Sequence, residues 1–188
     1  MTLYEIRNKC IIEILKSTSI HNVLDLGCGD GKLFNILCQE NSFIKIGGVD
    51  ISYKKIAKLR KKYDSFGHMF FYNSSFLCYN PEFRCYDGIV LSEVIEHLKK
   101  EELQILFDLI FKRYMPNMVI LTTPNRSYNY HFEVLHNGLR HSSHIFELSE
   151  VEFSFFIKKL TENYRNYDFK GGYCDSTHAT HLLICKKY

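Results

Sequence analysis

The stretch Asn22-Val-Leu-Asp-Leu-Gly-Cys-Gly-Asp-Gly31 decides the fold, because it joins a buried strand to a glycine-rich turn. Residues 22–26 are apolar apart from Asn22 and Asp25 and predict a strand, and residues 32–39 predict a helix after the turn. Glycines let the backbone turn sharply and come close to a ligand. A strand, a glycine turn and a helix in this order predict a nucleotide-type binding site.

The rest of the chain continues this alternation of strands and helices. Further strands are predicted at residues 44–50, 68–72, 86–91, 117–122, 167–173 and 181–185. Helices are predicted at residues 2–16, 53–63, 93–114 and 149–163, the last opened by the capping box Ser149-x-x-Glu152. This pattern predicts an α/β fold, with a parallel sheet that helices cover on both faces.

The length of 188 residues fits one domain, so we expect a single catalytic domain over residues 1–188. Residues 1–20 would form its N-terminal helical segment. Residues 126–147 have no clear periodicity, and so long a loop in a compact domain is usually functional. We therefore expect an active-site segment there.

The composition is that of an ordinary folded protein, with 46% hydrophobic and 24% charged residues. A net charge of +3 permits a nucleic-acid partner without arguing for one. The seven cysteines include no Cys-x-x-Cys pair, and no N-terminal apolar run resembles a signal peptide. No apolar stretch approaches the roughly 18 residues of a membrane span. We expect a soluble, cytoplasmic protein in a reducing compartment.

An acidic residue supports a nucleoside cofactor. Asp50 ends the second strand about 20 residues after the turn, where a carboxylate can accept hydrogen bonds from both hydroxyls of a ribose. A dinucleotide site needs a third glycine where this chain has Lys32, so a pyrophosphate fits poorly. Together, the glycine turn and Asp50 favour a site for a methyl donor, S-adenosylmethionine, over a purely structural role of the glycine turn.

Glu93, Glu96 and His97 form a second group of ligand-type residues. Their spacing of i, i+3 and i+4 predicts that they share one helix face beside the cofactor cleft. Two carboxylates and an imidazole suit Mn²⁺, Co²⁺ or Zn²⁺ and are compatible with Mg²⁺. His144, in the long loop, supplies another imidazole. The alternative is a helix of the kind also found in methyltransferases of small molecules, with no metal.

These motifs resemble class I methyltransferases and, more closely, the HEN-type small-RNA 3′-terminal 2′-O-methyltransferases. That family combines Glu-x-x-Glu-His, Thr-Pro-Asn and Arg-x-x-x-His-x-Phe-Glu, which stand here at residues 93–97, 123–125 with Asn129, and 140–147. The resemblance implies a single Rossmann-like domain with a mostly parallel seven-stranded sheet and an antiparallel last strand.

The resemblance also implies where the methyl donor lies. Gly27 and Gly29 would border its methionine part, Asp25 would hold its amino group, and Asp50 would hold its ribose. The remaining expected donor contacts, of which Ser75 and Phe76 would flank the adenine, are Ile51, Ser75, Phe76 and Ser92.

By the same resemblance, four residues would bind one divalent metal, Mg²⁺ or Mn²⁺ with Co²⁺ also suited: Glu93, Glu96, His97 and His144. Arg140 and His141 would lie near the RNA terminus. The proton of the ribose hydroxyl would pass to His97, to His141 or to water. A cation that held both the 2′ and 3′ oxygens would explain selectivity for a free 3′ end.

The expected function is therefore metal-dependent methylation of the 2′-hydroxyl at the 3′ end of a small or cleaved RNA, with a separate RNA-binding or repair protein as a further partner. The alternatives are a class I small-molecule O- or C-methyltransferase and a noncatalytic binding subunit. The sequence departs from the family at Ser143, often Asp, and at Leu148, where Trp is expected. Aromatic side chains would serve the core first, with base stacking by Tyr128 or Tyr130 as the second option.

Overall fold

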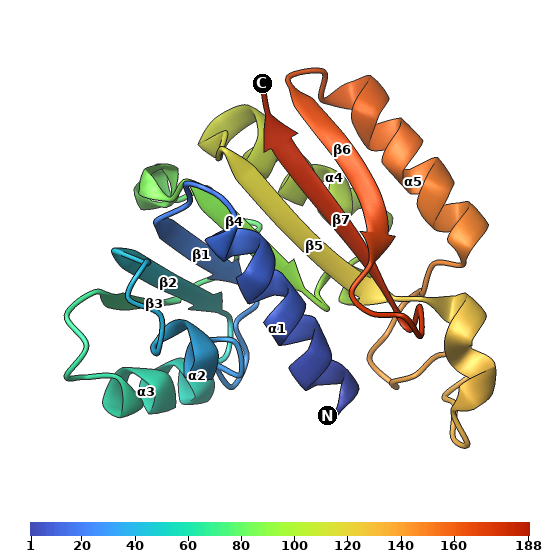
Figure 1. The fold of residues 1–188 in the computed structure, drawn as a ribbon, viewed down its shortest axis with the longest axis horizontal. Helices are drawn as coiled ribbons and strands as arrows, with labels where there is room; N and C mark the ends of the chain where they lie inside the picture. The colour runs from blue at the N-terminus through green and yellow to red at the C-terminus, as the bar shows by residue number, and fades with distance from the viewer.

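The structure, a computed structural model, describes residues 1–188 and is built on one seven-stranded sheet (Figure 1). The strand order is β3-β2-β1-β4-β5-β7-β6. Every neighbouring pair from β3 to β5 is parallel, and β7 runs antiparallel to both β5 and β6. The strands are β1 (Asn22–Leu26), β2 (Lys45–Asp50), β3 (Met69–Asn73), β4 (Gly88–Ser92), β5 (Met118–Pro124), β6 (Tyr167–Tyr173) and β7 (Thr180–Lys187). The predicted mostly parallel sheet with an antiparallel last strand is confirmed.

Five α-helices and four shorter helical segments surround this sheet. The α-helices are α1 (Leu3–Lys16), α2 (Phe34–Leu37), α3 (Tyr53–Lys62), α4 (Lys100–Asp108) and α5 (Glu150–Asn163). The shorter segments are η1 (Pro81–Cys85), η2 (Ile95–His97), η3 (Leu109–Tyr114) and η4 (Arg126–His131). The helices predicted over residues 93–114 are a 3₁₀ turn, an α-helix and a π-helical turn.

The two faces of the sheet carry separate hydrophobic cores, because successive residues of a strand point to opposite sides. Val23 packs with α1, α2 and α3, whereas Leu24, the next residue, packs with α4, η3 and α5. Figure 1 shows α1 crossing one face of the sheet, with α2 and α3 beside it. Strands that are buried on both faces are apolar throughout, which explains why their sequences predict them well.

Capping fixes where α5 begins and therefore where the long loop ends. The Ser149 hydroxyl accepts a hydrogen bond from the Glu152 amide at 3.4 Å, and the Glu152 carboxylate accepts one from the Ser149 amide at 2.8 Å. This reciprocal pair is the predicted capping box. None of the helices has the length and apolar character needed to cross a membrane.

The strand order reverses between β1 and β4, and ligands of such sheets bind at the carboxyl ends of the strands beside this reversal. The glycine turn follows β1 at this point, and Ser92 ends β4 next to it. The fold therefore places the predicted donor residues and the residues after β4 at one end of the sheet.

Candidate active site

The glycine turn folds back over the neighbouring strand. The amides of Gly27 and Cys28 donate hydrogen bonds to the Val49 carbonyl at 2.8 and 3.0 Å. Gly27 has a φ of 84°, in the left-handed region, and a Cβ built there would lie 2.8 Å from Val94 Cγ2. Only glycine fits this position, since a side chain would be strained and would clash.

Asp50 and the turn form one unit. One carboxylate oxygen of Asp50 accepts a hydrogen bond from the Gly29 amide at 3.0 Å, and the other accepts one from the Ser52 amide at 2.8 Å. The Asn73 side chain donates to the carbonyls of Asp50 and Ile51. The end of β2 is therefore held against the turn at the edge where the ribose is expected.

A cavity of about 220 Å³ opens beside the turn. Four predicted donor residues line it, namely Asp25, Gly27, Gly29 and Ser92. Helix α1 adds three residues that the sequence did not single out, Tyr4, Arg7 and Asn8. The Arg7 guanidinium also donates a hydrogen bond to the Ser92 hydroxyl at 3.3 Å. The N-terminal helix thus forms one wall of the cavity.

Four predicted donor residues do not line this cavity. Asp50 lies behind the turn, and Ile51 is 78% exposed at the end of β2. The Ser75 hydroxyl accepts a hydrogen bond from the Leu77 amide, and the Phe76 ring lies 3.7 Å from where a Cβ of Gly27 would be. Phe76 is therefore next to the turn, whereas contact of Ile51 and Ser75 with a donor stays a prediction.

Asp25 is a cavity residue with strongly perturbed acidity. Its side chain is buried, and burial together with the negative charge of Asp50 raises the pKa of Asp25 to about 7. A cation in the cavity would favour the ionised carboxylate. This acid therefore fits the ammonium group of an amino-acid ligand such as the methionine part of S-adenosylmethionine.

Three predicted metal ligands come together at the far end of the cleft. Glu96, His97 and His144 offer ligand atoms that all lie within 4.8 Å of one another. Glu96 is fully buried; one of its carboxylate oxygens accepts a hydrogen bond from the Thr123 hydroxyl at 3.0 Å, and the other has no partner. Burial and the adjacent charge of Glu93 raise the pKa of Glu96 well above its usual range. An orphaned carboxylate oxygen beside two imidazoles fits a divalent cation.

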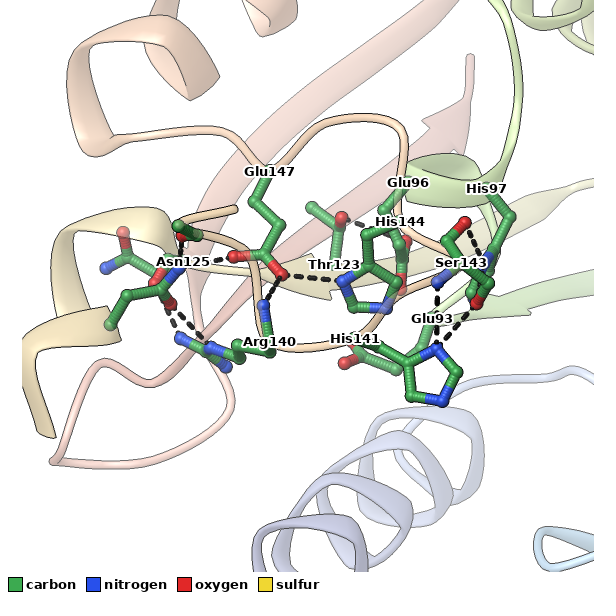
Figure 2. A network of polar contacts seen from close by, with 12 residues as sticks. Glu93, Glu96, His97, Thr123, Asn125, Arg140, His141, Ser143, His144 and Glu147 are labelled. Carbon is green, nitrogen blue, oxygen red and sulfur yellow. Dashed lines mark hydrogen bonds and ion pairs between the residues drawn. The ribbon is translucent and has the colours of Figure 1, made fainter. Parts of the chain in front are cut away.

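Hydrogen bonds orient both imidazoles of this cluster (Figure 2). His97 Nδ1 donates to the Ser143 carbonyl at 3.1 Å, and His144 Nδ1 donates to the Glu147 carboxylate at 2.6 Å. Each histidine therefore keeps its Nε2 free as a ligand atom, in the way that outer hydrogen bonds orient metal-binding imidazoles. Burial, together with the neighbouring imidazoles, lowers the pKa of His97, which favours its neutral, ligating form.

Glu93 does not share a helix face with Glu96 and His97, so that prediction is wrong. It precedes the short 3₁₀ turn η2 and has a left-handed backbone, with a φ of 56°. Its carboxylate forms an ion pair with Arg7 at 3.3 Å and accepts a hydrogen bond from the Thr122 hydroxyl at 3.2 Å. Spacing alone suggested an α-helix, but strained backbone of this kind is frequent at functional sites. Its role as a ligand stays a prediction.

Arg140 and Glu147 hold the long loop together rather than pointing freely into the cleft. The Glu147 carboxylate, 1% exposed, accepts hydrogen bonds from the Asn129 side chain at 2.6 Å and from the Arg140 amide at 2.7 Å. The Arg140 guanidinium donates to the Asn129 side chain at 2.7 Å and to the Asn125 carbonyl at 2.5 Å. Asn125, the last residue of the Thr-Pro-Asn segment, and Asn129 thus have a structural role, because they hold the loop through these contacts.

His141 is exposed beside the cluster, with its ring centroid 5.6 Å from that of His144. Its Nδ1 accepts hydrogen bonds from the Ser143 hydroxyl at 2.6 Å and from the Ser143 amide at 3.1 Å. Neutral His141 therefore carries its proton on Nε2. The same serine hydroxyl lies 3.1 Å from His97 Nδ1, so Ser143 connects the two histidines.

Comparison with known proteins agrees with this geometry. A family model described as a methyltransferase domain matches residues 24–117. The chain is also similar to the methyltransferase domain of a bacterial protein, CtHen1-CN, with 30% identity and a TM-score of 0.85 over 98% of this chain and 100% of that one. The chain belongs to the HEN-type family of class I methyltransferases.

Other relatives of this HEN-type domain are longer. The small RNA 2′-O-methyltransferase of Tetrahymena thermophila is 29% identical over 182 residues, which are 87% of this chain and 43% of that protein. A chain from the Pnkp1/Rnl/Hen1 RNA repair complex shares the fold, with a TM-score of 0.73 and 20% identity over 100% of this chain and 42% of its own length. The HEN-type domain spans less than half the length of each.

The two departures from the HEN-type pattern have different consequences. Ser143, where Asp is frequent, still bonds to both His97 and His141, so the serine keeps a polar link between them. Leu148, where Trp is expected, pairs with Asn125 in an isolated parallel bridge, and its carbonyl lies 3.0 Å from His181 Nε2. The backbone of residue 148 therefore secures the loop, whichever side chain it carries.

Proposed function

We propose that this domain transfers the methyl group of S-adenosylmethionine to the 2′-hydroxyl of the 3′-terminal nucleotide of a small RNA, with the help of one divalent cation. The observation that carries the proposal is the orphaned Glu96 oxygen beside His97 and His144, at the same end of the sheet as the glycine turn. The family of the chain and the names of its relatives support the choice of reaction.

On the donor side, the chain supplies a cavity of fixed shape. Gly27 and Gly29 leave room for a ligand against the turn, and Asp25 in its ionised form attracts the donor's ammonium group. The amides of Gly29 and Ser52 hold the Asp50 carboxylate, which is the predicted acceptor for the ribose hydroxyls. S-adenosylmethionine bound there supplies a methyl group on a sulfonium that an oxygen nucleophile can attack.

On the acceptor side, Glu96, His97 and His144 are the residues that would hold the cation, Mg²⁺ or Mn²⁺, and Glu93 is the predicted fourth ligand. Bound there, such a cation supplies Lewis-acid chemistry that favours the ionised form of a ribose hydroxyl near neutral pH. Glu147 holds the His144 imidazole in its ligating tautomer.

His141 is suited to donate a hydrogen bond to the RNA terminus. Its Nδ1 is occupied by Ser143, so its Nε2–H is the group that remains for a substrate oxygen. His97 likewise uses Nδ1 for the Ser143 carbonyl. His141 Nδ1 is already occupied by Ser143, and His97 Nε2 is the predicted ligand atom, so neither imidazole has a basic nitrogen left to accept a proton. We propose that water takes up the proton of the ribose hydroxyl.

The test is methylation of a short single-stranded RNA, measured as resistance of its 3′ end to periodate oxidation. Resistance should appear with S-adenosylmethionine and Mn²⁺ and should be lost with a chelator or with a 3′-phosphate on the RNA. His144→Ala should abolish it, whereas His136→Ala, which removes an exposed histidine of the same loop, should not. Full activity in chelator would contradict the metal, and full activity of His144→Ala would contradict the role of His144 as a metal ligand.

We further propose that a separate RNA-binding or repair protein assists this domain. The domain spans 43% of the Tetrahymena thermophila relative, and one chain of the same fold belongs to the Pnkp1/Rnl/Hen1 RNA repair complex. If a partner supplies affinity, the isolated domain should methylate RNA with a high KM that falls when the partner is added, while kcat changes little.

A further inference from the structure

Three aromatic rings gather on η4, directly after the Thr-Pro-Asn segment. The His131 ring contacts both tyrosine rings in a tilted arrangement, with its centroid 4.2 Å from that of Tyr128 and 4.0 Å from that of Tyr130. Tyr130 is 79% exposed and His131 is also exposed, whereas Tyr128 is half-buried. An apolar ring this exposed contributes little to the core, so packing does not explain Tyr130.

These three aromatic rings are carried by a segment that hydrogen bonds hold in place. The Asn125 side chain accepts a hydrogen bond from the Ser127 amide at 2.9 Å, and its carbonyl accepts one from the Tyr128 amide at 3.0 Å. Asn129, between the two tyrosines, is buried and donates to Glu147 at 2.6 Å. The aromatic rings therefore project from backbone that is fixed on both sides.

The same contacts join these aromatic rings to the imidazole cluster. Glu147 accepts a hydrogen bond from Asn129 with one carboxylate oxygen. With the other it accepts a hydrogen bond from His144 (Figure 2). Segment η4 follows β5 at the end of the sheet that also carries the glycine turn (Figure 1). Two hydrogen bonds, from Asn129 to Glu147 and from His144 to Glu147, thus link the segment that carries Tyr130 to His144, which is expected at the reacting ribose.

We propose that Tyr130, supported by His131, is a stacking platform for a nucleobase close to the 3′ end of a single-stranded RNA. The proposal rests on the proposed function, because the strand is placed by its terminal ribose at Glu96, His97 and His144. A flat exposed ring accepts any base on its face, so such a platform holds the strand without selecting a sequence. Tyr128 has a different task, since its ring lies 5.9 Å from the Arg140 guanidinium and packs against the loop.

The experiment measures stacking directly and without the methyl donor. Short single-stranded RNAs with a free 3′ end carry the fluorescent base 2-aminopurine at one of the last four positions, and each is titrated with protein. Wild type should quench the fluorescence at one position or at two adjacent ones. Tyr130→Ala should lose this quench and raise the dissociation constant about fivefold to one-hundredfold, whereas Tyr130→Phe, which keeps the ring, should behave as wild type.

Tyr188→Ala is the matched control, because Tyr188 is 86% exposed and follows β7 at the opposite end of the sheet. It should leave quench and affinity unchanged. His131→Ala is a second variant, which should weaken the quench by removing the ring behind Tyr130.

The outcomes separate this inference from the proposed function. Equal quench and affinity for wild type and Tyr130→Ala, with both proteins methylating RNA, would overturn the platform and leave the reaction intact. Quench that depends on Tyr130 without methylation in any metal would support the platform and overturn the proposed reaction. Binding of RNA with no quench at any of the four positions would also overturn the platform.

Discussion

The unusual acidity of Asp25 predicts that donor binding depends on pH. Its carboxyl lines the donor cavity, and burial and the charge of Asp50 raise its pKa to about 7. A carboxyl whose pKa is raised is protonated below that pKa, so below pH 7 the cavity loses the negative charge that an ammonium group requires. Affinity for the donor or its product should therefore increase as pH rises from 6 to 8.

The magnitude follows from the ionised fraction of Asp25. With a pKa of about 7, that fraction is about 0.09 at pH 6 and about 0.9 at pH 8. If only the ionised form binds well, the apparent dissociation constant is the intrinsic one divided by this fraction. Binding should then be about tenfold weaker at pH 6 than at pH 8.

Calorimetric titration of S-adenosylhomocysteine at pH 6, 7 and 8 measures this dependence. Asp25→Asn should bind weakly at every pH and should lose the trend, which separates the carboxyl from any titration of the ligand. Asp64→Asn, which removes an exposed acid elsewhere, should keep both the affinity and the trend. Constant affinity of the wild-type protein over this range would refute the role given to Asp25.

Three further predictions concern the loop, the turn and the core. Glu147→Gln should weaken activation by Mn²⁺ about 10- to 100-fold in a metal titration, because His144 loses its charged acceptor, and an unchanged titration would contradict that link. Gly27→Ala should abolish donor binding and lower the free energy of unfolding by about 1–2 kcal/mol, whereas Gly67→Ala, with open space around it, should do neither. Burial lowers the pKa of His181 to about 4, so its protonation favours the unfolded chain and this stability is lost as pH falls from about 6.5 towards 4. Urea unfolding should show a loss of about 2 kcal/mol between pH 7 and 5 that is absent in His181→Phe, and equal pH dependence of the two proteins would exclude His181 as its source.

The donor half of the site could be predicted from sequence because its signals are local. The strand at residues 22–26, the glycine turn and Asp50 are each recognised within a few residues, and the structure has β1 over the predicted range. The structure then brings Gly29 and Asp50 into direct contact, as their pairing in the sequence suggested. The same holds for the capping box at Ser149, whose two hydrogen bonds form within four residues.

The acceptor half could be predicted only in part, because it depends on contacts between distant segments. A spacing of three and four residues indicates a helix face, but Glu93 adopts a left-handed backbone and turns to Arg7, 86 residues earlier in the chain. No local pattern shows that α1 lines the donor cavity. Nor does one show that Glu147, three residues after the loop's last histidine, would be buried between that histidine and Asn129.

The contacts of Glu147 give a physical reason why Asn129 and the motif Arg140-x-x-x-His144-x-Phe146-Glu147 occur together in this chain. A carboxylate that is 1% exposed is costly unless donors surround it, and here Asn129, the Arg140 amide and His144 supply them. Hydrogen bonds outweigh burial and keep the pKa of Glu147 below its usual value, so the group stays ionised and can orient His144. Replacing any one donor leaves the others around a poorly satisfied charge. These hydrogen bonds hold a loop that has no helical or strand periodicity, and the same loop carries the predicted ligand His144 and the proposed aromatic platform.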